Sequence, residues 1–305
     1  CGEGRSEESL PGSVLPEFIP DYRIDTVAPA PEPVKVRAET RTARLQFLRD
    51  SYKILPDLKN NRAELDTVSH SILLVKNNPD VTITGIYITG YASPEGTVAH
   101  NLKLSENRAL ALGDYIRRQD RIDPELLHVA WKGEDWEGLR AALDRFPGLL
   151  KRDEVLRVID ECTGDRDACE KRLQQIEPPT IYQRLLNEVY PLLRRNEYRI
   201  VYNVRNFNIE EARRMVDERP DLLSLTEMYK VAASYEKGSA DYDKVMRTAA
   251  RLYPDSPAVV NDRALEAIAA GKHAAAVELL EQAAVTEQHP TLVNTCLLYT
   301  SPSPR

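Results

Sequence analysis

The spacing of hydrophobic residues predicts a region of mixed strands and helices, followed by a region of helices alone. Period-two alternation and short apolar runs indicate strands, while apolar residues at helical spacing indicate amphipathic helices. Strands are expected at 42–48, 81–89, 127–131 and 196–204, and helices at 61–77 and from the loop after residue 97 to about Gln119. The last strand carries Tyr198, Ile200, Tyr202 and Val204 on one face, and the second helix carries Leu104, Leu112, Tyr115 and Ile116.

A helical insertion at about 133–196 separates the third predicted strand from the last one. Four segments have helical patterns, at 136–146, 152–161, 165–176 and 179–196. Pro178 is expected outside the fourth helix and Pro179 in its first turn, where a missing N–H costs no hydrogen bond. The predicted fold class is therefore α+β, with a helical insertion in the α+β domain and an all-α region after it.

From Ile209 onward, four pairs of residues recur at a spacing of 34 residues, which is the length of a tetratricopeptide repeat. The pairs are Lys237 and Gly271, Tyr242 and Ala276, Met246 and Leu280, and Ala249 and Ala283. We expect tetratricopeptide-like helical repeats over 208–295, with a surface for a protein partner.

Composition and the two ends of the chain narrow the choice of function. The net charge of −7 argues against nucleic acid as a partner, and no apolar run is long enough for a membrane span. Residues 1–40 are rich in proline and predict a linker or the end of an upstream domain. Cys1 is interpreted either as a lipid attachment site or as an accidental start. Residues 296–305 resemble a translated sequencing adapter.

The cysteines and histidines predict neither a metal site nor a cofactor. Cys162 and Cys169 flank a short segment between two predicted helices, and both a disulfide and two free thiols are consistent with that spacing. The five histidines are scattered along the chain and lie in no nucleophile motif. An acidic cluster at Glu134, Asp135 and Glu137 is interpreted as the start of a helix rather than as an acid–base pair.

The most specific motif follows the second strand. Gly90, Tyr91, Gly96, Asn101, Leu104, Ser105, Arg108 and Ala109 fall without a gap into the core pattern of the OmpA-like peptidoglycan-binding domain family, which this stretch resembles. The resemblance implies the element order β-α-β-α-β-β over 41–206. The stretch 90–96 and the later stretch 134–140 together look like envelope proteins of Bacteroidetes, which combine this domain with a helical tail.

The resemblance also implies a ligand, the diaminopimelate of the peptidoglycan stem peptide. Arg108 matches the family's arginine, whose planar guanidinium pairs with a carboxylate. Ser93 stands where the family has an aspartate, so one charged partner of the ligand is replaced by a hydroxyl. Glu95 is either a substitute for that aspartate or a solvated loop acid. Asn101 is expected to brace the loop and to lie near the ligand.

We therefore predict a non-enzymatic protein of the periplasm, associated with the outer membrane, that binds the cell wall without a covalent bond. The alternative is an envelope scaffold for protein–protein interactions that has lost wall binding. The replacement of the aspartate by Ser93 is the main argument for that alternative.

Overall fold

A computed structural model describes residues 26–47, 51–283, 289–293 and 295. These residues form two compact units. One unit lies within 33–208, and the other combines the segment before residue 33 with the helices from Ile209 onward. Most of the predicted linker, Cys1 and the adapter-like tail 296–305 lie outside the described residues.

A four-stranded sheet forms the centre of the 33–208 unit. Its strands are β1 (Lys35–Ala43), β2 (Val81–Ala92), β3 (Leu127–Glu134) and β4 (Asn196–Val204). The order across the sheet is β1-β4-β2-β3, in which β4 runs antiparallel to both neighbours and β3 runs parallel to β2. The mixed α and β composition expected from the sequence is confirmed.

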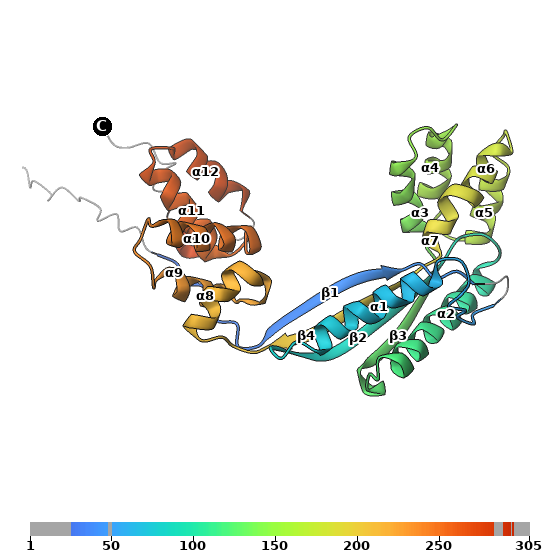
Figure 1. Ribbon diagram of the computed structural model, residues 1–305. Coiled ribbons are helices and arrows are strands. Elements are labelled where there is room, and N and C mark those ends of the chain that lie inside the picture. The colour runs from blue at the N-terminus through green and yellow to red at the C-terminus, as the bar shows by residue number, and fades with distance from the viewer. Residues whose placement is uncertain (1–25, 48–50, 284–288, 294, 296–305) are drawn as a thin grey trace, which may run out of the picture. The chain divides into compact units, whose positions relative to one another are not determined.

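Helices α1 (Asn61–Lys76) and α2 (Val98–Gln119) lie on the same face of this sheet (Figure 1). The buried face of α2 is made largely of small side chains, which let the helix approach β2 closely. A Cβ atom added at Gly90 of β2 would lie 2.3 Å from the carbonyl oxygen of Ser105, so glycine is required there. Tyr115, predicted on the buried face, is only partly buried at its margin. The buried residues of α2 are Asn101, Ser105, Ala109, Leu112, Gly113 and Ile116.

The first strand differs from the prediction. It begins at Lys35, within the predicted linker, and ends at Ala43, whereas the sequence pattern placed a strand at 42–48. β1 is an edge strand that pairs only with β4, so most of its side chains are polar and partly exposed. Of the apolar alternation, Ala43 is the last residue of β1 and Leu45 lies in the segment that follows the strand; both side chains are buried.

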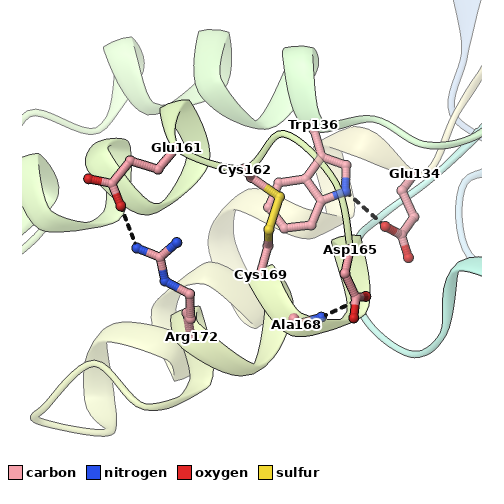
Figure 2. The surroundings of a disulfide bond; sticks show 8 residues. All are labelled: Glu134, Trp136, Glu161, Cys162, Asp165, Ala168, Cys169 and Arg172. Carbon is pink, nitrogen blue, oxygen red and sulfur yellow. Dashed lines mark hydrogen bonds and ion pairs between the residues drawn. A yellow bond between two sulfur atoms is a disulfide. The ribbon is translucent and has the colours of Figure 1, made fainter.

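The insertion forms a helical subdomain between β3 and β4 with a hydrophobic core of its own. Its helices are α3 (Trp136–Ala142), α4 (Arg152–Asp160), α5 (Arg166–Gln174), α6 (Thr180–Arg184) and α7 (Tyr190–Leu193). Of the two interpretations of Cys162 and Cys169, the structure has the disulfide, which links the segment just after α4 to α5 (Figure 2).

The last helix of the insertion is not the single helix 179–196 that the sequence predicted. A π-helical turn at Leu185–Val189 separates α6 from α7, and Asn196 belongs to β4. Pro191 explains the interruption, because its nitrogen has no hydrogen to donate to the carbonyl one turn earlier.

The second unit contains α8 (Ile209–Glu218), α9 (Leu225–Ala232), α10 (Ala240–Leu252), α11 (Pro257–Ala269) and α12 (His273–Gln282). Gly238 and Gly271, both with positive φ, precede α10 and α12. The 34-residue spacing predicted that Lys237 is the equivalent of Gly271. The structure instead has the equivalent turn at Gly238. A tetratricopeptide-like repeat in this unit stays a prediction.

Candidate functional site

A pocket of about 600 Å³ opens where β2 ends and α2 begins. Its walls come from four separate parts of the 33–208 unit: the segment after β1, the loop after β2, the first half of α2 and the residue that precedes β4 by two positions. The polar and aromatic side chains that line it are Gln46, Phe47, Ser93, Glu95, His100, Asn101, Arg108 and Arg194.

Arg108 is a partly buried cation in the wall of this pocket. Its Nε atom is buried and has no hydrogen-bond partner, and the guanidinium forms no salt bridge with any residue that the structure describes. The guanidinium carbon lies 4.8 Å from the centre of the Phe47 ring. Burial, and then repulsion by Arg194, lower the pKa of Arg108 to about 10, while Glu95 acts in the opposite direction. Arg108 remains charged at neutral pH, so it is a cation without a bound counter-charge.

Arg194 is the residue that the sequence reasoning missed. Its Nε donates to the hydroxyl of Ser93 over 3.2 Å, and its Nη2 forms a salt bridge with Glu95. Ser93 is buried, whereas the Arg194–Glu95 pair is partly exposed. The position that carries an aspartate in the resembling family therefore carries a hydroxyl that accepts a hydrogen bond from a guanidinium.

Asn101 holds the loop in place, as the sequence predicted. Its Nδ2 donates to the carbonyl oxygen of Glu95 at 2.9 Å and to Glu134 Oε1 at 2.8 Å. Glu134 also accepts a hydrogen bond of 2.8 Å from the indole of Trp136, which lies in the core of the insertion. Gly96 has a φ of +102°, a conformation that favours glycine. A continuous chain of hydrogen bonds thus connects the insertion to the pocket loop.

The insertion also contacts the start of α2. Asp167 Oδ1, on α5, accepts a hydrogen bond of 2.8 Å from the backbone nitrogen of Val98. Asp165 caps α5 by accepting from the nitrogen of Ala168 at 3.1 Å, close to the Cys162–Cys169 disulfide (Figure 2). Since the first N–H groups of a helix have no partner within the helix, Asp167 supplies one from another element.

We expect Asp167→Ala to loosen the first turn of α2. The substitution removes the acceptor of the Val98 amide, and loss of a helix cap to alanine costs about 1 kcal/mol. Backbone amides at 98–101 should exchange with deuterated solvent several-fold faster, while amides at 110–119 keep their rates; mass spectrometry of peptic peptides measures both. The matched control is Asp153→Ala, because Asp153 is an exposed acid in the first turn of α4. Unchanged exchange at 98–101 would contradict this role of Asp167.

The acidic cluster after β3 has structural partners. Asp135 caps α3 by accepting from the nitrogen of Gly138 at 2.9 Å, and it forms a salt bridge with Arg195. Arg195 also pairs with Glu197 at 2.9 Å and stacks over the ring of Tyr91. The Glu134 carboxylate is bonded to Asn101 and Trp136. These contacts agree with the interpretation of the cluster as the start of a helix.

The structure brings all four predicted site residues, Ser93, Glu95, Asn101 and Arg108, into the lining of one pocket. In the described part of the chain, no group of three or more His, Cys, Asp or Glu side chains has an arrangement suited to a metal ion. None of the described helices combines the length and the apolar character needed to cross a membrane.

Comparison with known proteins gives a short sequence match and several structural matches. The chain is 43% identical over 49 residues to Outer membrane protein 41 of Porphyromonas gingivalis (strain ATCC BAA-308 / W83), which covers 16% of this chain and only 12% of that protein. The OmpA-like domain of FopA1 from Francisella tularensis subsp. tularensis SCHU S4 aligns over its full length with 68% of this chain, at 16% identity and a TM-score of 0.29. At that TM-score the superposition does not establish a shared fold. No family model matches the chain. The comparisons thus relate one short stretch of the chain to an outer membrane protein.

Proposed function

We propose that the chain is a non-enzymatic, OmpA-like protein of the bacterial envelope that binds the peptidoglycan stem peptide in the pocket around Arg108. The observation that carries the proposal is the state of Arg108, a partly buried residue whose Nε is fully buried without a hydrogen-bond partner and whose guanidinium lines a pocket without a salt bridge. A buried charge without a partner is unfavourable, and a ligand carboxylate supplies the missing partner. The ligand class is taken from the OmpA-like family that the motif between Gly90 and Arg108 resembles.

The place of the protein in the cell follows from the same proposal. A cell-wall ligand lies in the periplasm, and the similarity to an outer membrane protein supports a position at the outer membrane. The Cys162–Cys169 disulfide suits this compartment, because disulfides persist in oxidising surroundings. The helices from α8 to α12 are available to bind a protein partner in the manner of tetratricopeptide-like repeats.

Cosedimentation of the full chain with purified peptidoglycan sacculi tests the proposal, and calorimetric titration with a stem peptide that contains diaminopimelate measures the affinity. We expect the protein in the pellet and a measurable heat of binding at millimolar or lower ligand. If the protein stays in the supernatant and gives no heat of binding, the proposed function is contradicted.

The second candidate is an envelope scaffold without wall binding. The observation in its favour is the contact of Arg194 with both Ser93 and Glu95, which places a cation beside the position of the missing aspartate. A scaffold of this kind would stay in the supernatant with sacculi and would bind a protein through the second unit.

A further inference from the structure

We propose that the pocket distinguishes between two forms of an amino acid group. It binds the form in which the nitrogen beside the carboxylate is acylated more tightly than the form in which that nitrogen is a free ammonium. The inference rests on the proposed function, and it names the form of the ligand that this chain prefers. It starts from the charges on the pocket wall, where Arg108 and Arg194 are cationic and Glu95 is anionic. These three side chains leave one positive charge uncompensated, so the pocket favours a ligand group with a net charge of −1.

A zwitterionic amino acid group does not meet this requirement. Its ammonium and carboxylate stand on the same carbon atom, so both enter the pocket together. Ser93 offers the ammonium a hydroxyl, but that hydroxyl already accepts a hydrogen bond of 3.2 Å from Arg194. Glu95 is bound to the same guanidinium, and an ammonium reaches it only by sharing or breaking that salt bridge. An ammonium in this position is therefore repelled by Arg194 and lacks a free counter-ion.

An acylated nitrogen removes the conflict. It carries no charge, and the carboxylate beside it is free to pair with Arg108 and to reduce the repulsion between the two guanidinium groups. That repulsion contributes to the lowered pKa of Arg108, second to burial. Arg194 is thus the specificity-determining residue of the pocket, and Arg108 is the residue that holds the carboxylate.

Two sources supply this chemistry. In a cross-linked stem peptide the side-chain amine of diaminopimelate is part of an amide bond, whereas in a free stem peptide it is an ammonium. The carboxyl terminus of any peptide is also an N-acylated amino acid. The wild-type full chain is therefore titrated with a diaminopimelate tripeptide whose side-chain amine is free and whose carboxyl groups other than the one beside that amine are amidated, with the same tripeptide after acetylation of the amine, and with N-acetyl-alanyl-alanine.

We expect the acetylated tripeptide to bind at least about fivefold more tightly than the free-amine form, which corresponds to roughly 1 kcal/mol. Arg194→Ala should reduce this ratio to within about twofold, and Arg194→Lys should preserve most of it because the charge remains. Arg118→Ala is the matched control, since Arg118 is an exposed arginine of α2 outside the pocket, and it should keep the wild-type ratio. Binding of N-acetyl-alanyl-alanine as tight as that of the acetylated tripeptide assigns the preference to peptide carboxyl termini; weaker binding assigns it to acylated diaminopimelate.

A free-amine tripeptide that binds the wild type as tightly as the acetylated form overturns the inference and leaves the proposed function standing. A preference that Arg194→Ala does not change also overturns it, because the selection would then come from another group. If neither tripeptide binds the wild type, the proposed function itself fails.

Discussion

Arg108→Ala should abolish retention on sacculi and weaken stem-peptide binding by roughly 30-fold or more. The estimate follows from the loss of one partner of a buried charge pair, which costs about 2–5 kcal/mol in binding. Cosedimentation and calorimetry of the full-length variant measure the effect. Arg108→Lys keeps the charge but not the planar pair of donors, so it should fall between the wild type and the alanine variant.

The stability of the variant separates a ligand-binding arginine from a structural one. A structural Arg108 would have a salt bridge or hydrogen bonds to lose, and its removal would lower the melting temperature. Its Nε atom instead lacks a partner, and its pKa is lowered by burial. We therefore expect the melting temperature of Arg108→Ala to equal or exceed that of the wild type. Arg118→Ala serves again as the control and should bind like the wild type. A variant that binds normally but melts several degrees lower would assign Arg108 to the fold.

The elements with a strong local pattern could be predicted from the sequence. β4 was expected at 196–204 and has those bounds, because its alternation reports a strand with one buried face. The helices α1 and α2 were predicted from apolar residues at helical spacing, which likewise indicates one buried face. β1 was placed about seven residues too late, since an edge strand with polar side chains on both faces has no hydrophobic period to detect.

The candidate site was found only in part, because its residues converge from distant segments. Ser93, Glu95, Asn101 and Arg108 lie in one motif and were predicted together. Arg194 lies about a hundred positions further along the chain. It contacts Ser93 only because the chain returns to the pocket at the end of the helical insertion. The pair Arg194–Arg195 before β4 was the one available signal, since two adjacent cations at the start of a central strand require partners. Nothing in the sequence around Phe47 indicated that this residue lines the pocket.

Loss of the Cys162–Cys169 disulfide should destabilise the insertion by roughly 2–3 kcal/mol. The value follows from the entropy of closing a loop of about eight residues in the unfolded chain. Both cysteines are buried in the hydrophobic core of the insertion, so serine substitution adds a cost of its own. Reduction of the wild-type protein by a dithiol reagent therefore gives the cleaner measurement, and Cys162→Ser with Cys169→Ser provides a permanent form. Thermal unfolding with and without reductant measures the change.

A local measurement distinguishes this effect from general destabilisation. The disulfide joins α4 to α5, and α5 carries basic residues that trypsin cleaves when the helix opens, among them Lys171 and Arg172. Reduction should accelerate cleavage at these sites about 30-fold or more if cleavage follows the population of the open form. Cleavage at Arg251 in α10 of the other unit should keep its rate. Equal rates at Lys171 and Arg172 before and after reduction would show that the packing of the insertion alone holds α5 in place. Because Asp167 of α5 binds the first turn of α2, a loosened α5 would also withdraw a contact from the helix that carries Arg108.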